Sequence, residues 1–294
     1  MKVYSLPCPS FPKKRRVLAL GCFDGTHLGH QALFEVACAE ADRLQAIPAV
    51  FTFSDFLPQK GAPLSPLADR LASMEKHGIK EAFLSPFSAV KELSPEAFIE
   101  GVLKAELSAV STVCGFNYRF GAGAKGNGET LRAAFPDAKQ VPAVTHGEAP
   151  ISSTRIRAAL EAGEIEEAEA LLGRPYAVTG KVSHGKGAGH LFGFPTANLT
   201  PTTLLPAYGV YETRVTVDGQ SYAALSDVGV RPTLEKGGEA RVESFLLDFT
   251  GDLYGKTVTV AFLRRLRGEE RFESAEALSA QIAKDIEYIK NTKR

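Results

Sequence analysis

Two histidines stand three positions apart in the stretch GCFDGTHLGH, residues 21–30, together with three glycines and one aspartate. At the start of a helix, His27 and His30 would lie on the same face. Imidazoles beside a helix N-terminus can donate hydrogen bonds to oxygens that gain charge when a phosphate is attacked. Glycines between them let a ligand approach the backbone closely. The stretch therefore predicts a site for a polyphosphate.

Two other interpretations of this stretch stay open. A metal site is poorer, because two histidines lack an obvious third ligand. The second alternative to a phosphate site is a plain glycine turn in which one histidine lies in the core and the other on the surface. The flanking elements favour phosphate: the apolar run RRVLAL before the stretch predicts a buried strand, and the amphipathic pattern after it predicts a helix. That helix has apolar positions at Leu33, Val36, Ala37 and Leu44.

The bulk composition excludes several classes of protein. Lys+Arg 34 balances Asp+Glu 34, so no overall field attracts nucleic acid or an anionic membrane. The opening MKVYSLPCPSFPKKRR is not expected to be a signal peptide, and no apolar run is long enough to cross a bilayer. Four cysteines without CxxC spacing predict reduced thiols and a cytoplasmic protein. They are Cys8, Cys22, Cys38 and Cys114.

The first half of the chain, to about residue 172, alternates short apolar runs with helical patterns. The runs IPAVFTF and VSTVCGF predict buried strands, and Ser65-Pro66 and Ser94-Pro95 predict helix starts. This alternation predicts α/β architecture with a doubly wound parallel sheet. Two further helices, STRIRAALEAG and EIEEAEALLG, are predicted to follow, with Gly173 as a C-cap.

The second half predicts an antiparallel β structure. YETRVTV and QSYAAL alternate around an Asp218-Gly219 hairpin turn, and RVESFLLDF and KTVTVAFL repeat that pattern. A helix capped near Ser274 is predicted to end the chain. The change of periodicity sets the domain boundary, with residues 1–172 and 173–294 as the two domains.

Glu243 is the candidate base of the second half. Burying a carboxylate without a partner is expensive, so a glutamate on the apolar side of a strand is unlikely to be idle. The alternative is a residue at the strand end that pairs with Arg231 or Arg241. By strand alternation, Glu243 shares its face with Phe245, Leu247 and Phe249.

Several motifs of the first half resemble one family. GCFDGTHLGH is similar to the HxGH signature of nucleotidyltransferases, in the form found in bacterial bifunctional riboflavin kinase/FMN adenylyltransferases (FAD synthetases). ISSTRIRAAL, residues 151–160, resembles the ISSTxIR motif of that family, and GFNYRFG resembles its aromatic loop. Taken alone, ISSTRIRAAL is typical of an ordinary capped helix, and GFNYRFG is typical of a strand end with a turn. Arg155 and Arg157 are two apart and cannot both face one ligand, and the resemblance selects Arg157.

The second half carries further motifs in the family's order. GFPTANL resembles the PTAN motif of riboflavin kinases. VESFLLDF, which precedes DLYGK, resembles the segment of riboflavin kinases that carries their catalytic glutamate. The glycine-rich stretch before GFPTANL is not a Walker A sequence, and by itself such a stretch is weak evidence, typical of a flexible turn. The resemblance implies a Rossmann-like nucleotidyltransferase domain followed by a riboflavin-kinase-like antiparallel β-barrel with a C-terminal helix.

The resemblance also implies site residues. Catalytic roles fall to His27, His30, Arg157 and Glu243. ATP or phosphate binding falls to Gly21, Phe23, Asp24, Gly25, Gly29, Ser153, Thr154, Gly185, Gly187 and Gly189. Asp24 is included through its place in the motif, and the alternative is that it binds the turn backbone. Flavin binding falls to Asn117, Tyr118, Phe120 and Arg231, and Mg²⁺ to Thr196 and Asn198.

The chain departs from the family at four places, one of which is Tyr118, where the aromatic loop of the family usually has phenylalanine. TFSDFLP stands where the family has TFxPHP, which puts Phe56 or a near neighbour in place of a histidine. SDVG stands for ANIG, which puts Asp227 in place of asparagine, and Phe245 replaces another histidine.

The implied function is phosphorylation of riboflavin to FMN by ATP, followed by adenylylation of FMN to FAD by a second ATP with release of pyrophosphate. The partners are these small molecules, with no nucleic acid and no membrane. Alternatives are a riboflavin kinase whose adenylyltransferase half is impaired, a non-catalytic flavin or nucleotide sensor, and another nucleotidyltransferase with an unrelated barrel.

Overall fold

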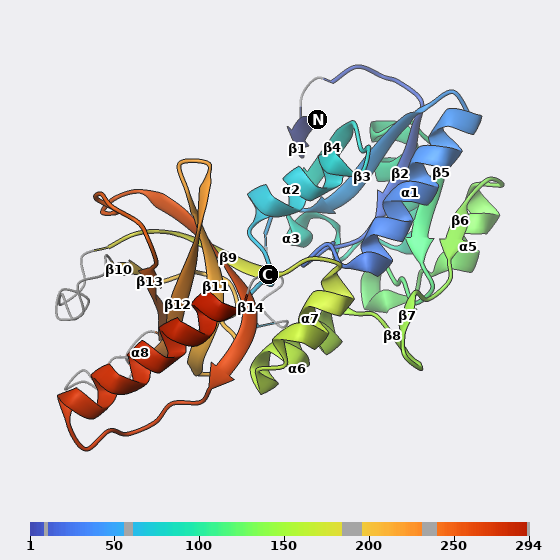
Figure 1. Cartoon of the computed structure of the whole chain (residues 1–294). Coiled ribbons are helices and arrows are strands. Elements are labelled where there is room, and N and C mark those ends of the chain that lie inside the picture. The colour runs from blue at the N-terminus through green and yellow to red at the C-terminus, as the bar shows by residue number, and fades with distance from the viewer. Residues whose placement is uncertain (9–10, 56–60, 184–195, 231–239, 293–294) are drawn as a thin grey trace. The chain divides into compact units, whose positions relative to one another are not determined.

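The computed structural model describes residues 1–8, 11–55, 61–183, 196–230 and 240–292 of the chain (Figure 1). They belong to two compact units, Met1–Ser153 and Thr154–Arg294, which are described separately. The predicted boundary between residues 172 and 173 stays a prediction, since the helices between Ser153 and Leu172 belong almost entirely to the second unit.

The first unit is built on a six-stranded parallel sheet with the strand order β1-β4-β3-β2-β5-β6. The strands are β1 (Lys2–Ser5), β2 (Arg16–Leu20), β3 (Ile47–Phe53), β4 (Glu81–Ser85), β5 (Ala109–Gly115) and β6 (Lys139–Val141). A small hairpin joins β7 (Thr145–His146) and β8 (Ala149–Pro150). The helices are α1 (Leu28–Arg43), α2 (Leu67–Lys76), α3 (Phe87–Val90), α4 (Pro95–Ala97), η2 (Phe98–Glu106), η3 (Ala122–Ala124) and α5 (Gly128–Ala134).

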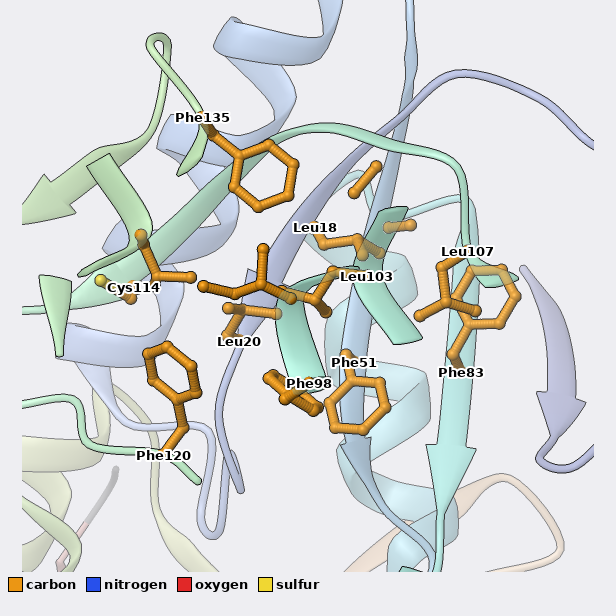
Figure 2. Close-up of a cluster of buried hydrophobic side chains, with 14 of the residues drawn as sticks. Leu18, Leu20, Phe51, Phe83, Phe98, Leu103, Leu107, Cys114, Phe120 and Phe135 are labelled. Carbon is orange, nitrogen blue, oxygen red and sulfur yellow. The ribbon is translucent and has the colours of Figure 1, made fainter. Parts of the chain in front are cut away.

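Strand β2 is buried on both faces, as its unbroken apolar run predicts. Val17 and Ala19 pack in the cluster that includes Phe34 of α1. Leu18 and Leu20 point to the opposite cluster, which contains the residues drawn in Figure 2. Helices therefore cover both faces of the sheet, and the predicted doubly wound architecture is confirmed.

The strand order reverses at β2. The chain moves from β2 to β3 and β4 on one side, and β5 and β6 lie on the other. In open α/β sheets, ligands bind at such a switch point, beside the carboxyl ends of the strands. The stretch 21–30 follows the end of β2 and the loop GFNYRFG begins at the end of β5, so both predicted binding segments start at this point.

Both predicted helices are present, but only one of the two predicted serine caps is correct. Ser94 caps α4, because its side chain accepts the Ala97 N–H at 3.1 Å. Helix α2 instead starts after Pro66, which has no side chain that can cap it. The Ser65 hydroxyl accepts the N–H of Gly25 at 3.2 Å and so serves a distant turn.

The second unit begins with α6 (Ser153–Ala162) and α7 (Ile165–Leu172), and Gly173 ends α7 in the left-handed conformation, as predicted. An antiparallel sheet follows with the order β10-β13-β12-β11-β14-β9. Its strands are β9 (Tyr176–Lys181), β10 (Thr196–Leu199), β11 (Gly209–Val217), β12 (Gln220–Val230), β13 (Ala240–Leu246) and β14 (Thr257–Arg267).

This sheet curls so that its two edges approach each other, in agreement with the predicted barrel. Its two edge strands are β10 and β9, and the N–H of Ser183 just after β9 donates to the carbonyl of Asn198 on β10 at 2.9 Å. A Cβ at Gly180 would lie 3.0 Å from Leu199, so glycine permits the close approach there. The predicted Asp218-Gly219 turn joins β11 to β12 with positive φ at both residues.

Helix α8 (Ala275–Asn291) ends the described chain and lies along the barrel (Figure 1). Ser274 caps it as predicted, by accepting the Ala277 N–H at 3.2 Å. Ile282, Ile286 and Ile289 pack in one cluster with apolar residues of the barrel strands.

Candidate active sites

The first candidate site is the turn between β2 and α1, where the two histidine rings stack on each other. Their centroids lie 3.6 Å apart and their planes differ by 18°. His27 is the N-cap of α1, and its Nδ1 accepts the N–H of His30 at 3.3 Å. An accepting Nδ1 leaves the proton of the neutral ring on Nε2. The predicted shared face is confirmed, and both imidazoles stand at a helix N-terminus.

Phe23 packs against the ring of His30. It is 0% exposed, and its ring meets that of His30 edge-on at 5.3 Å between centroids. A Cβ at Gly21 would lie 2.9 Å from the Phe23 ring, and one at Gly29 would lie 3.1 Å from the His27 ring. These two glycines therefore make room for the protein's own rings.

Asp24 ties the turn to another loop. It is 3% exposed, and its Oδ1 accepts the N–H groups of Leu64 at 2.9 Å and Ser65 at 3.4 Å. Its carbonyl accepts the hydroxyl of Ser153 at 2.9 Å. Two backbone N–H groups of the turn are also engaged. That of Gly25 binds Ser65, and that of Gly21 donates to the Phe51 carbonyl.

Arg70 and Thr52 also hold this turn, and sequence reasoning missed both roles. Arg70 is 5% exposed and donates from Nη1 to the carbonyl of Cys22 at 2.8 Å, and the Thr52 hydroxyl donates to the same carbonyl at 3.2 Å. Burial lowers the pKa of the Arg70 guanidinium, and nearby Asp24 opposes that shift. Phe23 and Thr26 adopt positive φ, so these bonds hold a backbone that is unfavourable for side-chain-bearing residues.

The aromatic loop after β5 is divided between core and surface. Asn117 is exposed, whereas Tyr118 is half-buried and stacks on Phe120 with 5.8 Å between centroids. Phe120 is 8% exposed in the core, where a Cβ at Gly126 would lie 2.6 Å from its ring. Burial, with the thiols of Cys22 and Cys114, raises the pKa of Tyr118 above its usual value.

Thr154 and Arg157 lie on α6, in the second unit. Arg155 of the same helix forms an ion pair with Glu167 of α7.

The second candidate site is a row of polar residues across three barrel strands. Asn198 of β10 lies directly opposite Glu243 of β13, which lies opposite Asp227 of β12. Direct cross-strand partners share a face of the sheet. This is the face on which Phe245 packs in one cluster with Ile282 of α8. The sheet register thus brings together the predicted base, one predicted metal ligand and the acidic departure from ANIG.

Asn198 has an orphaned atom in this row. The residue is 3% exposed, and its Oδ1 has no hydrogen-bond partner among the residues the structure describes. A buried amide oxygen left in this way costs free energy unless something binds it. Hard cations such as Mg²⁺ bind oxygen ligands of this kind, so the side-chain oxygen of Asn198 fits a magnesium site. Within the same described ranges, no cluster of three histidine, cysteine or acidic residues could hold a metal ion by itself.

Glu243 is half-buried at the middle of this row. Arg241, one of its two alternative partners, has an Nε without a hydrogen-bond partner in the described part of the chain, and no ion pair joins the two there. Phe245 and Leu247 lie in one cluster as predicted. Phe249 lies beyond the end of β13 and packs against Tyr222.

Some predicted site residues lie outside the described residues. They are Phe56, Gly185, Gly187, Gly189 and Arg231.

Two family models match the chain. The FAD synthetase family matches residues 11–155, and the riboflavin kinase family matches residues 172–293. Three proteins named bifunctional riboflavin kinase/FMN adenylyltransferase are similar over almost the whole chain. The protein of Listeria monocytogenes is 36% identical over 92% of this chain and 90% of its own length. That of Bacillus subtilis is 33% identical over 95% and 94%, and that of Escherichia coli is 33% identical over 93% and 91%.

A solved structure from Streptococcus pneumoniae covers 100% of both chains, with a TM-score of 0.91 and 34% identity. That protein is named a macrolide-efflux protein. Among the described residues of the present chain, no helix has the length and apolar character needed to span a membrane. The matches to both halves favour neither a riboflavin kinase whose adenylyltransferase half is impaired nor a non-catalytic flavin or nucleotide sensor.

Proposed function

This chain belongs to the family of bifunctional riboflavin kinase/FMN adenylyltransferases, and from that premise we propose which residues carry each of its two reactions. ATP phosphorylates riboflavin to FMN, and a second ATP adenylylates FMN to FAD. We assign the first reaction to residues 173–294 and the second to residues 1–172. The observation that carries the assignment is the row Asn198, Glu243 and Asp227 on one face of the barrel.

In the kinase reaction, Glu243 accepts the proton of the ribityl hydroxyl. The hydroxyl oxygen attacks the γ-phosphorus of ATP, the bond from that phosphorus to the bridging oxygen breaks, and ADP leaves. Asn198, through its orphaned Oδ1, and Thr196 would hold Mg²⁺. When bound, the ion supplies positive charge to the phosphate oxygens. Gly185, Gly187 and Gly189 bind ATP, and Arg231 binds the flavin, in the roles that the resemblance implies.

In the adenylyltransferase reaction, a phosphate oxygen of FMN attacks the α-phosphorus of ATP. The bond to the bridging oxygen breaks, and pyrophosphate leaves. The attacking phosphate is already ionised, so this site needs positioning and charge stabilisation rather than a strong base. His27 and His30 donate to the oxygens that gain charge, and Arg157 adds fixed charge.

The remaining residues of this half position the substrates. Phe23 and Asp24 act through the shape of the turn, since both are buried and engaged with the protein. Asn117 and Tyr118 border the flavin, and Phe120 supports Tyr118 from the core. Backbone and hydroxyl contacts to ATP are assigned to Gly21, Gly25, Gly29, Ser153 and Thr154.

We place the enzyme in the cytoplasm, without nucleic-acid or membrane partners. The four cysteines show no CxxC spacing, which fits a reducing compartment, and the balanced net charge offers no general attraction to polyanions.

Two variants test the division of labour. Glu243→Gln should lower FMN formation from riboflavin by about 10²–10⁴-fold, because the general base is lost, and leave FAD formation from supplied FMN intact. His30→Ala should lower FAD formation by about 10²–10³-fold and leave FMN formation intact. His146→Ala and Glu287→Gln change exposed residues of the same types and serve as controls. Loss of both activities in either variant would contradict the assignment.

A further inference from the structure

The carbonyl of Cys22 accepts hydrogen bonds from two side chains that are distant in the sequence. Nη1 of Arg70, on α2, donates to it at 2.8 Å, and the hydroxyl of Thr52, on β3, donates to it at 3.2 Å. Both donor residues are buried, and all three residues belong to the first unit. One main-chain oxygen at the start of the histidine turn is therefore held by two buried donors.

The guanidinium of Arg70 is buried at a cost in free energy. A charged group that leaves water needs an ion pair or several hydrogen bonds to compensate. In the described part of the chain, Arg70 forms no ion pair, its Nε has no hydrogen-bond partner, and the bond to Cys22 is the one hydrogen bond of its side chain. The side chain is thus placed to hold this carbonyl, at the expense of its own solvation.

The direction of this carbonyl controls the backbone of the next residue, Phe23. A peptide group is planar, so the Cys22 carbonyl and the N–H of Phe23 turn as one unit, and the angle φ of Phe23 changes with them. Phe23 has φ +54°, in the left-handed region that side-chain-bearing residues rarely adopt. Turning the carbonyl away from its two donors would let this angle return to ordinary negative values. The two hydrogen bonds therefore hold Phe23 in a strained conformation.

The strained turn is connected to both imidazoles. The ring of Phe23 meets the ring of His30 edge-on, with 5.3 Å between centroids. The carbonyl of Phe23 accepts the N–H of Thr26 at 3.1 Å, and Thr26, which also has positive φ, directly precedes the N-cap His27. A relaxation of the backbone at Phe23 would therefore reach His30 through the aromatic ring and His27 through Thr26.

We propose that Arg70, assisted by Thr52, is a positioning residue for FMN adenylyl transfer. It acts through the Cys22 carbonyl and keeps the stacked rings of His27 and His30 in one orientation. The inference rests on the proposed function, in which these two imidazoles donate to the phosphate oxygens that gain charge. Misplacing such donors is costly, since a shift of about 1 Å can cost ~100-fold in rate.

The test measures both activities of the chain, residues 1–294, in Arg70→Met, which keeps a long unbranched side chain but removes the donors. The kcat of FAD formation from supplied FMN should fall by about 10- to 100-fold, with the KM for ATP changed by less than about threefold. FMN formation from riboflavin should stay within about twofold, because it is assigned to the other half of the chain. Arg70→Lys keeps a charged donor and should retain more FAD formation than Arg70→Met.

Thr52→Val tests the same carbonyl with a smaller change, because it replaces only the hydroxyl by a methyl group. The kcat of FAD formation should fall in the same direction but by less than in Arg70→Met, and if Arg70→Met does not fold, Thr52→Val decides by the same measurements. Arg15→Met is the matched control and should leave both activities unchanged. Nη2 of Arg15 also donates to a main-chain carbonyl of the first unit, that of Leu44 at 3.2 Å, but at the opposite end of α1 from the histidines.

Proton NMR of the histidine rings gives a readout that does not depend on either reaction. Stacked rings shift each other's protons upfield, and the spectra of His27→Ala and His30→Ala assign the signals. Arg70→Met and Thr52→Val should lose part of this shift, and Arg15→Met should keep it.

Unchanged ring-proton shifts in Arg70→Met, or in Thr52→Val if the former does not fold, would overturn the positioning role whatever the activities. Altered shifts with undiminished FAD formation would overturn the link to adenylyl transfer. If the wild-type chain makes FMN from riboflavin but no FAD from FMN, the proposed function of the first half fails and the inference fails with it. If the wild-type chain makes FAD and Arg70→Met makes it equally fast, the inference alone fails.

Discussion

Asp227 is a single-residue departure from the family motif ANIG, and it lies directly across from Glu243. The pKa of Asp227 is raised to about 6. The largest cause is partial removal of its carboxylate from water, and repulsion by the carboxylates of Glu269 and Glu243 adds to it, whereas Arg267 opposes the shift. Gly229 leaves space for the Glu269 carboxylate, because a Cβ there would lie 2.7 Å from its Oε1. Much of the Asp227 residue stays exposed, so the acidic neighbours are an essential part of the shift.

This shift predicts a pH-dependent stability cost. In the unfolded chain the pKa of an aspartate is about 3.9, which is lower than the pKa of about 6 that Asp227 has in the folded protein. Between these values the folded state holds a proton that the unfolded state has lost, so the stability contribution of Asp227 falls as pH rises through this window and stays low above it. Asp227→Asn should raise the urea midpoint of the ligand-free protein at pH 7, with the gain shrinking toward pH 4.5. An equal gain at both pH values would contradict this explanation, and Glu287→Gln controls for the loss of one surface charge.

At the scale of elements, a buried ion pair links the first unit's strands. Nε of Arg16 on β2 lies 2.7 Å from Oε2 of Glu81 on β4, with side chains 0% and 6% exposed. Arg16 also donates to the carbonyls of Pro12 and Leu107 at 2.7 and 2.9 Å. One guanidinium thus satisfies groups from three separate segments.

Removing only one partner of this pair should be strongly destabilising. Arg16→Met leaves the Glu81 carboxylate buried and unpaired, which should lower the free energy of unfolding by about 3–5 kcal/mol. Urea unfolding followed by circular dichroism measures this. The double variant Arg16→Met/Glu81→Leu should lose less than Arg16→Met alone, because no unpaired charge remains. The single variant Glu81→Leu completes the comparison. If the loss of unfolding free energy in the double variant equals the sum of the losses in Arg16→Met and Glu81→Leu, the unpaired charge is not the cause.

The elements themselves could be predicted from the sequence, because each depends on local periodicity. The buried run of β2, the Asp218-Gly219 turn and the Ser94 and Ser274 caps involve residues a few positions apart. Ser65 shows where local reasoning fails. It has the residue type of a cap, yet its hydroxyl binds Gly25, forty positions away.

The candidate sites could be predicted as motifs but not as geometry. The spacing of His27 and His30 predicted a shared face, and the structure stacks them. Nothing in the local sequence around Arg70 shows that it reaches the Cys22 carbonyl, because that contact exists only after the sheet has formed. The row of Asn198 opposite Glu243 likewise depends on strand register, which alternation alone does not fix.

At the scale of the whole molecule, the chain combines a parallel and an antiparallel sheet in two units. The product of the reaction assigned to the barrel, FMN, is the substrate of the reaction assigned to the parallel sheet.

The most direct measurement is a time course of the purified protein, residues 1–294, with riboflavin, ATP and Mg²⁺, in which riboflavin, FMN and FAD are separated by chromatography. We predict that FMN rises first and that FAD then accumulates at its expense, and that a chelator of divalent cations stops FMN formation. Accumulation of FMN without FAD, even when FMN is supplied directly, would contradict the claim that the first half is an active adenylyltransferase. Absence of both products would contradict the account of this chain as an enzyme.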